Sequence, residues 1–429
     1  MHYEKFQDGT VKCIEDEIPF EVPEGWSWAR LRDICMMSAG KSKSTVQIKS
    51  EPFEGSYPCF GGNGVRGYVD EYNQDGIFSI VGRQGALCGN INIAIGKFYA
   101  TEHAVVTTLF DGIDFKWSNY ILEALRLNNY ATGAAQPGLS VANILNVFVP
   151  VPPTQEQDRI GNSVYESLKI VEALEQEKID LQKNIITAKT KILDLAICGK
   201  LVPQDPNDEP ASVLLERIRA EKEELIKHGK IKRDKKESVI FKGDDNSYYG
   251  IHLPDSWNWA SLREIALSIS DGSHNPPPNN GSGIPLLSAA NINDNSILMN
   301  EISRWITNEE WKIENQRTNI EVGDVLLTIV GSIGRSAVVQ NNNHFALQRS
   351  VAVIKPCLIN PLYLMHIVQS PQIQKWLTDN SKGTAQKGIY LNALSLMIIP
   401  IPPLAEQARI VELIHIAYKH LDLISNALL

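Results

Sequence analysis

The side chains that could perform chemistry in this sequence do not form a catalytic set. The phosphate-wrapping pattern Gly-x-x-x-x-Gly-Lys-Ser/Thr does not occur, and the nine histidines include no H-x-x-x-H pair joined to a third metal ligand. Asp294 and the run Glu310-Trp311-Lys312 could be taken for part of a metal nuclease, but so short a match is expected by chance. We therefore predict no catalytic residue and no metal site in this chain.

A second catalytic candidate is the run His274-Asn275-Pro276-Pro277-Pro278. It is similar to the Asn-Pro-Pro-aromatic loop of amino-methyltransferases, but Pro278 stands where an aromatic ring would stack on a flipped base. No glycine-rich methyl-donor loop follows a strand in this sequence. A turn is the better interpretation of this run.

Glycine-rich elements carry the remaining candidate chemistry, at residues 61–67, 82–85 and 331–335. Such loops expose backbone N–H groups and present an Arg or Gln at a rigid tip, which suits phosphate oxygens and base edges. For any single loop a tight β-turn is the simpler interpretation. The second and third elements align at an offset of 249 and each holds an Arg, which favours a binding role.

The sequence contains one plan twice, and this repeat must position those loops. The segment Pro23–Ile34 returns at 254–265, an offset of 231, with Pro, Trp-x-Trp-Ala, Leu-Arg and Ile in common. The runs 133–138 and 150–153 return at 383–388 and 400–403, both at an offset of 250. The second copy has therefore gained 19 residues, which we place around 275–283 and after Ala290.

A helix start follows each Pro-x-Pro-Pro exit. The first helix is predicted over 155–197, which at 1.5 Å per residue is roughly 60 Å long. Its apolar positions alternate at three and four residues, a spacing typical of a coiled-coil seam. The seam positions predicted to bind partner helices, or to pair with the second copy's helix, are Val171, Leu174, Leu181, Ile185, Ile192 and Leu195. That second helix begins at Ala405.

Composition restricts the class of protein without naming its function. Lys and Arg number 41 against 50 Asp and Glu, a formal net charge of −9 that disfavours a nucleic-acid partner. Six of the acidic residues, however, lie within residues 1–21 against two basic ones, and the two globular segments 22–150 and 251–400 each carry a net charge of only −1. Six scattered cysteines indicate a reducing compartment, and no apolar run reaches 18 residues. We predict a soluble cytoplasmic protein with no membrane contact.

Taken together, these motifs resemble the specificity subunit of a type I restriction-modification system over nearly the whole chain. The motifs that carry the resemblance are the paired Trp-x-Trp-x-x-Leu starts at Trp26 and Trp257, the block Tyr57-Pro58 to Gly64, the run Gly323-Asp324-Val325-Leu326 with Gly331 to Arg335, the Pro-x-Pro-Pro exits, and Gly199 to Pro206. Each motif is weak alone, and together they are specific.

The resemblance implies two target-recognition domains that each read one half of a bipartite, asymmetric site in double-stranded DNA. It implies an α+β fold, in which two similar mixed α/β domains are separated by long helices that form an antiparallel coiled coil and act as a ruler. The domain boundaries that follow are an N-terminal extension (1–21), domain 1 (22–153), a helical spacer and linker (154–250), domain 2 (251–403) and a C-terminal helix (404–429).

Partners and cofactors are also implied by the resemblance. Two modification (methyltransferase) subunits would dock on the helices, and restriction subunits would complete the assembly. The chain itself would hold no cofactor, because S-adenosylmethionine, ATP and Mg²⁺ belong to those partners.

Loop chemistry supplies the expected DNA contacts. These are Lys41, Lys43, Arg66, Arg83, Gln84 and Gln136 in the first domain, and Ser273, His274, Asn275, Arg335, Lys382, Gln386 and Lys387 in the second. The four tryptophans of the repeated starts are expected to be packing anchors.

Two other functions stay open from the sequence. A stand-alone DNA-modifying enzyme would transfer methyl groups without partners. A coiled-coil scaffold that joins two protein-binding globules would have no affinity for DNA.

Overall fold

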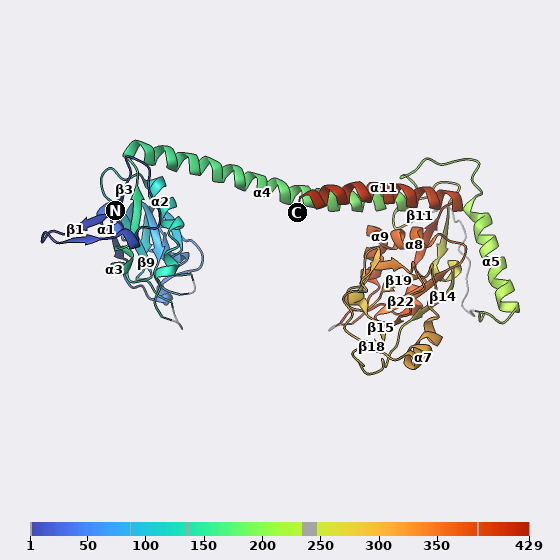
Figure 1. The fold of residues 1–429 in the computed structure, drawn as a ribbon. Coiled ribbons are helices and arrows are strands. Elements are labelled where there is room, and N and C mark those ends of the chain that lie inside the picture. Colours follow the sequence, from blue (N-terminus) through green and yellow to red (C-terminus); the bar gives the residue numbers. More distant parts are fainter. Residues whose placement is uncertain (1, 86, 134–136, 234–246, 384–385, 429) are drawn as a thin grey trace. The chain divides into compact units, whose positions relative to one another are not determined.

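The computed structural model describes residues 1–429 except 1, 86, 134–136, 234–246, 384–385 and 429 (Figure 1). The chain divides into two compact units, which we call unit 1 (Met1–Glu177) and unit 2 (Lys178–Leu429). A single 44-residue helix, α4 (Thr154–Ile197), begins in unit 1 and ends in unit 2. This agrees with the helix predicted over 155–197.

Unit 1 is built on a six-stranded sheet with the strand order β4-β9-β7-β8-β5-β6. All neighbours pair antiparallel except β5 and β8. The elements are β1 (Tyr3–Lys5), β2 (Val11–Cys13), β3 (Ser27–Arg30), α1 (Leu31–Ile34), β4 (Cys35–Ala39), β5 (Tyr57–Gly61), β6 (Gly64–Val69), β7 (Gln74–Gly82), β8 (Ile91–Ala100), β9 (Ala104–Leu109), α2 (Phe115–Ala124), α3 (Val141–Ile144) and β10 (Phe148–Val151). Helix α2 and the first turns of α4 pack together beside the sheet, where Lys116 donates to Asn162.

Unit 2 repeats this topology with its sheet divided in two. The order β14-β22-β19 corresponds to β4-β9-β7, and the parallel pair β15-β21 corresponds to β5-β8. The elements are α5 (Ala211–Lys227), β11 (Ser247–Tyr248), β12 (Ile251–His252), β13 (Asn258–Ser261), α6 (Leu262–Ile265), β14 (Ala266–Asp271), β15 (Ile284–Leu287), β16 (Ile292–Asn293), β17 (Ser296–Ile297), β18 (Trp305–Ile306), α7 (Asn308–Thr318), β19 (Val325–Thr328), β20 (Ser336–Val338), β21 (Ala346–Leu347), β22 (Val351–Pro356), α8 (Pro361–Val368), α9 (Pro371–Asp379), α10 (Leu391–Leu394), β23 (Ile398–Ile401) and α11 (Leu404–Ala427).

One long strand of unit 1 accounts for the division of the sheet in unit 2. Strand β8 pairs with β7 along its length and with β5 at its end, whereas in unit 2 two short strands, β20 and β21, share those pairings. The run Asn341-Asn342-Asn343 lies between them. Because Asn is depleted in strands, this run explains why the strand does not continue.

Of the two places predicted for the residues that the second copy gained, the structure confirms the one after Ala290 and corrects the other. Lys41 and Ser273 make the same backbone hydrogen bond, as do Thr101 and Gln348, so the second copy is five residues shorter between the first strand of the sheet and the next. The added residues lie between β15 and β19 and include helix α7. The 275–283 stretch predicted to hold an insertion is therefore part of a shortened loop.

A two-stranded ribbon closes each unit and starts its long helix. Strand β3 pairs antiparallel with β10, and β13 with β23, so the Trp-x-Trp start lies against the Pro-x-Pro-Pro exit in both copies. Gln157 and Gln407 are buried in the first helical turn that follows. The Gln157 carboxamide donates to the Pro152 carbonyl and accepts from the Asp114 N–H at 2.9 Å each. Gln407 makes the same pair with Pro402 and Asn360.

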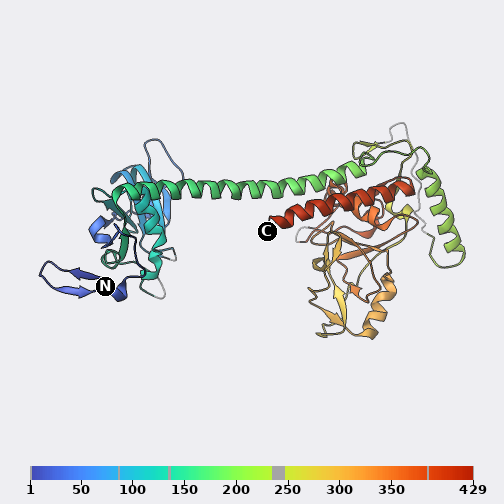
Figure 2. The same cartoon turned by 45° about the horizontal axis from the view of Figure 1, so that its top comes forward.

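Within unit 2 the end of α4 packs antiparallel against α11 (Figures 1 and 2). The Lys189 ammonium pairs with Asp422, and the Tyr418 hydroxyl donates to the Lys189 carbonyl at 3.3 Å. Leu193 and Ile197 lie in the same buried cluster as Ile410 and Ile414. The antiparallel direction matches the prediction.

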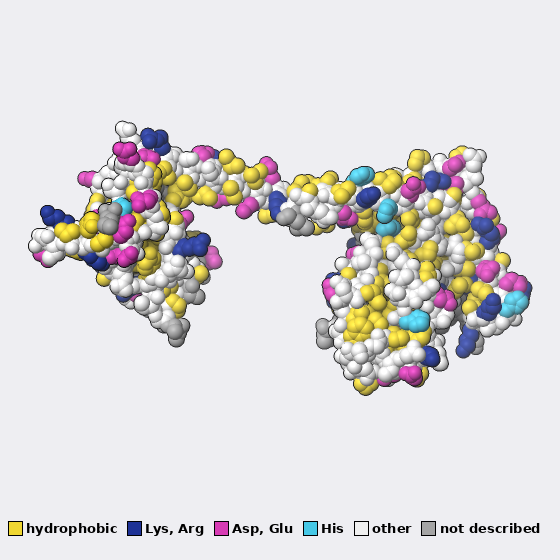
Figure 3. Space-filling view, in the orientation of Figure 1, with side chains coloured by type: hydrophobic (Ala, Val, Ile, Leu, Met, Phe, Trp, Pro, Cys, Tyr) yellow, Lys and Arg dark blue, Asp and Glu magenta, His cyan; other side chains and the backbone are white. Residues whose placement is uncertain are grey.

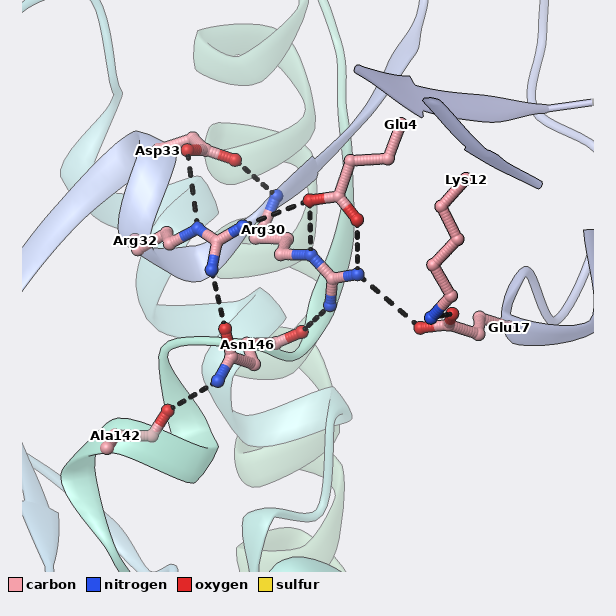
Figure 4. Close-up of polar contacts among 8 residues, drawn as sticks. All are labelled: Glu4, Lys12, Glu17, Arg30, Arg32, Asp33, Ala142 and Asn146. Atoms are coloured by element: carbon pink, nitrogen blue, oxygen red, sulfur yellow. Dashed lines mark hydrogen bonds and ion pairs between the residues drawn. The ribbon is translucent and has the colours of Figure 1, made fainter. Parts of the chain in front are cut away.

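The N-terminal hairpin β1-β2 is fastened to the ribbon by a cluster of charges (Figure 4). The guanidinium of Arg30 donates to both carboxylate oxygens of Glu4, at 2.8 and 2.6 Å, and covers the ring of Phe148. Arg32 donates to Glu4 as well, at 3.0 Å. The hydrogen bond from Arg30 lowers the pKa of Glu4 although burial of the carboxyl opposes the shift.

Candidate nucleic-acid interface

Backbone hydrogen bonds bring four separate loops of unit 1 to one end of its sheet. The Lys41 N–H donates to Ala100, the Thr101 N–H to Phe60, and the Arg83 N–H to His103. The segment that ends at Gly138 lies beside Gln84 in an isolated bridge. Because these bonds are made by the backbone, the loops are held in place whatever side chains they carry.

Unit 2 holds its loops with the same bonds. The Ser273 N–H donates to Leu347, the Gln348 N–H to Leu287, and the Ile329 N–H to Ser350. Gly388 forms bridges with Val330 and Lys382, as Gly138 does with Gln84 and Thr132. Close approach also requires glycine at the same place, because a Cβ on Gly40 or Gly272 would lie 2.1 Å from a backbone oxygen.

This frame corrects the alignment of the glycine-rich loops. Gly85 donates to Pro137 and Gly331 donates to Lys387, so Gly85 and Gly331 are equivalent, at an offset of 246. The predicted offset of 249 is wrong by three residues. Arg83 is therefore equivalent to Ile329, so Arg83 and Arg335 do not occupy equivalent positions.

The loops of unit 1 surround a hollow of about 580 Å³. It is lined by Gly61, Gly62, Asn63, Gly64, Val65, Arg66, Gln84, Gly85, Leu87 and His103. Polar side chains of Asn63, Arg66, Gln84 and His103 share its walls with the apolar Val65 and Leu87. An amide, a guanidinium and an imidazole therefore face one concave surface, and all three are groups that can hydrogen-bond the edges of bases.

Unit 2 presents a charged cluster at the corresponding end of its sheet. The carboxylate of Asp271, nine-tenths buried, pairs with Arg317 and lies 2.8 Å from Nε2 of His274. The imidazole of His274 is exposed, with its Nε2 turned toward this carboxylate. Arg349 is exposed beside this cluster, and its N–H donates to the Ser273 carbonyl.

The predicted contact residues occupy different environments around these loops. Arg66 and Gln84 line the hollow of unit 1, and Arg83 is partly buried next to it. The residues exposed at the loop tips are Lys41 in unit 1 and His274, Asn275, Arg335, Lys382, Gln386 and Lys387 in unit 2. Ser273 is buried, with 6% of its surface exposed. Gln136 lies outside the described residues.

Lys43 differs from Lys41 in having its charge neutralised inside unit 1. Only 8% of its side chain is exposed, and the ammonium lies 2.5 Å from Glu71 and 3.9 Å from Asp70. The hydrogen bond to Glu71 raises the pKa of Lys43, so the ion pair persists at neutral pH. Lys41 makes no ion pair among the described residues.

Sequence reasoning missed several side chains of these loops. Asn63 and His103 line the hollow of unit 1, and Arg317 and Arg349 lie at the cluster of unit 2. Arg349 precedes β22 by two residues, where Glu102 precedes β9. The repeat could have revealed this position, but Arg317 comes from α7, which has no counterpart in unit 1.

The predicted helix seam divides into an exposed and a covered part. Val171, Leu174 and Leu181 are exposed, at 48, 58 and 40%. Ile185 is buried, and Ile192 and Leu195 are partly buried. Exposed hydrophobic side chains can be followed along α4 in the space-filling view (Figure 3).

In the parts of the chain that the structure describes, no group of three or more His, Cys, Asp or Glu side chains is placed to hold a metal ion. None of the described helices is long and apolar enough to cross a membrane.

Comparison with known proteins finds a protein family whose model matches most of the chain. A model of the type I restriction modification DNA specificity domain matches residues 23–191 and 254–428. The EcoEI specificity subunit of Escherichia coli is 24% identical over 99% of this chain and 83% of its own length. The EcoprrI specificity subunit of the same species is 40% identical, over 39% of this chain and 43% of its own length. The crystal structure of the HsdS subunit from Thermoanaerobacter tengcongensis shares the fold, with a TM-score of 0.53 and 17% identity over 96% of this chain and 93% of that one.

Lys41 and Lys43 give a matched pair of variants that tests this surface. Each phosphate that a free lysine neutralises steepens the dependence of log K on log salt by about 0.9 for duplex DNA. We expect Lys41→Ala to reduce that slope by about this amount, and Lys43→Ala to leave it unchanged because Glu71 already neutralises the ammonium. Fluorescence anisotropy with labelled duplex DNA over a range of NaCl concentrations measures the slope. Equal losses for both variants would contradict this assignment of the surface.

Proposed function

This chain belongs to the type I restriction modification DNA specificity family, and from that premise we propose that it is the sequence-reading subunit of a type I restriction-modification complex. In this proposal each unit reads one half of a bipartite, asymmetric site in double-stranded DNA. The reaction is carried out by partner subunits, which transfer a methyl group to adenine or cut the DNA.

The observation that carries the proposal is one backbone frame used twice with different side chains. The hydrogen bonds that hold the loops recur in both units, while the residues at the tips do not. If the loops had only a structural role, their packing would recur and the residues at their tips could vary. Such a role would not explain why four loops are held together at one end of the sheet. Reading two different half-sites requires this combination.

The chemistry of the tips suits contacts in the major groove. Arg66 can donate two hydrogen bonds to guanine O6 and N7, and Gln84 can pair with adenine N6 and N7. In unit 2 the exposed imidazole of His274 suits a hydrogen bond to a base edge. Arg335, Lys382 and Lys387 suit phosphates, which set position but carry no sequence information.

We also propose that the helices bind the partners and set the distance between half-sites. The exposed seam at Val171, Leu174 and Leu181 offers apolar surface to helices of two modification subunits. Restriction subunits complete the assembly, and S-adenosylmethionine, ATP and Mg²⁺ are bound by the partners. Because α4 is a single uninterrupted helix, its length can act as a ruler.

The first test is to map methylated adenines in cells that express the chain with the modification subunit encoded beside it. We expect a split, asymmetric motif that disappears when this gene alone is deleted, because the partner would retain its chemistry but lose its target. Single-molecule sequencing of the host DNA measures this. Methyl transfer by the purified chain alone, or a motif that persists after deletion, would contradict the proposal.

The second test shortens the helix. Removal of residues 167–173, which are all exposed, takes about 10 Å from α4 and keeps its helical phase nearly unchanged. At 3.4 Å per base pair we expect the spacer of the methylated motif to become about three base pairs shorter, with both half-sites retained. The control replaces Ser167, Lys169 and Glu172 by Ala, which keeps the length and should keep the spacer. An unchanged spacer in the shortened chain would rule out the ruler.

A further inference from the structure

An arginine and a buried carboxylate form a fixed pair at the loop end of unit 2. Asp271 is the last residue of β14, and Arg317 lies in the last turn of α7. Nη2 of Arg317 donates to Oδ1 of Asp271, and Nε donates to the Asp271 carbonyl at 2.9 Å. The side chain of Asp271 is 10% exposed, whereas that of Arg317 is 51% exposed. A buried partner therefore holds a guanidinium that solvent can reach.

Helix α7 is anchored to the rest of unit 2, which gives the Arg317 backbone a fixed place. A capping box closes its first turn. The Trp311 indole donates to the Phe345 carbonyl at 3.2 Å, and Thr318, the residue after Arg317, is buried. A side chain that is held both at its backbone and at its tip has little rotamer freedom left, so it loses little entropy when it binds.

The pairing with Asp271 uses one edge of the guanidinium and leaves the other edge open. A guanidinium carries five N–H groups in one plane, and Nε and Nη2 share the edge that faces Asp271. Nε2 of His274 flanks this edge, 3.4 Å from Nη2. Nη1 donates to no residue that the structure describes. The open edge has one N–H from each terminal nitrogen, a pair of donors that matches O6 and N7 of guanine in the major groove.

The ion pair makes Arg317 better suited to a base than to a phosphate. Asp271 neutralises its charge, as Glu71 neutralises Lys43 in unit 1. Binding to phosphate depends on the charge of a free cation, because its free energy comes from the release of counterions. A base edge is read by hydrogen bonds in fixed positions. The pair gives up charge and keeps a fixed hydrogen-bonding edge.

The equivalent place in unit 1 has neither partner of this pair. Lys41 and Ser273 make the same backbone hydrogen bond, so Ala39 stands where unit 2 has Asp271. Helix α7, which supplies Arg317, has no counterpart between β5 and β7. The pair therefore belongs to the half-site of unit 2.

We propose that Arg317 reads a guanine in the half-site of unit 2 and that Asp271 positions it. This inference rests on the proposed function, since it names one base that unit 2 reads. In it Arg317 contacts the DNA, whereas Asp271 acts only through Arg317.

The first test maps methylated adenines in cells that express variants of the chain with its modification subunit. We expect the parent motif to require guanine in the half-site that residues 22–150 do not specify. Arg317→Lys keeps a cation beside Asp271 but loses the planar fork, so we expect one guanine of that half-site to become replaceable by other bases. Lys312→Ala removes an exposed cation of the same helix and should keep the parent motif. A split motif that Arg317→Lys leaves unchanged would overturn this inference alone, and the absence of a split motif would overturn the proposed function as well.

The second test uses the complex of the chain with its modification subunit and duplexes that carry 7-deazaguanine, which lacks the N7 acceptor. Each guanine of the half-site is replaced in turn. We expect one replacement to weaken binding of the parent complex about tenfold. The same replacement should have no effect on the double variant Arg317→Ala, Asp271→Ala, because the N–H donors are gone. An equal loss for the double variant would overturn the assignment to Arg317.

Salt dependence separates base reading from phosphate binding and from a purely structural role. The double variant removes a neutral pair, so its slope of log K against log salt should equal that of the parent. Asp271→Ala alone leaves Arg317 as a free cation, so we expect a slope steeper by about 0.9 together with a weaker effect of 7-deazaguanine. A slope about 0.9 shallower for the double variant would assign Arg317 to a phosphate. Equal losses on every duplex with an unchanged slope would make the pair structural, and either result would overturn the proposal.

Discussion

The structure depends on how each sheet is attached to the long helix that follows it. We call this attachment the joint. In both units a buried glutamine in the first helical turn uses its oxygen and its nitrogen to tie the Pro-x-Pro-Pro exit to the N-terminus of a neighbouring helix. A buried amide with both ends satisfied allows little rotation, because any rotation would leave polar atoms unpaired in the interior. The antiparallel ribbon fixes the same point from the other side. A helix that starts from such a joint can transmit the orientation of a unit.

This constraint explains why recognition and architecture can vary independently. The loops are held by backbone bonds and by glycines that cannot accept a Cβ, so the side chains at their tips are free to differ. Unit 1 uses a hollow lined by an arginine, an amide and an imidazole, whereas unit 2 uses an imidazole held by a buried carboxylate. Two half-sites of different sequence can therefore be read by one fold. The charge of −9 is no obstacle, since six acidic residues lie in the N-terminal 21, where Glu4 and Glu17 pair with Arg30.

The sequence predicted the parts of the fold that depend on local chemistry. The repeated starts and exits became the two ribbons, the long helix begins at Thr154, and Trp257 and Trp259 are buried as packing anchors. The errors came from tertiary pairing. The loop offset of 249 was wrong because helices and loops of different length separate the equivalent positions of the two units. Arg317, on an added helix, and the ion pair of Lys43 depend on which segments meet, so no local pattern could reveal them.

Each unit is proposed to read its own half-site. The most direct measurement replaces residues 22–150 with the corresponding segment of another family member of different specificity and maps the methylated adenines. The donor segment is chosen to keep the strands of the ribbon, and Gln157 of the parent chain is retained. The exchanged unit should therefore dock on α4 as the original does. We expect one half of the bipartite motif to change while the other half and the spacer stay the same. A change in both halves, or in neither, would contradict it.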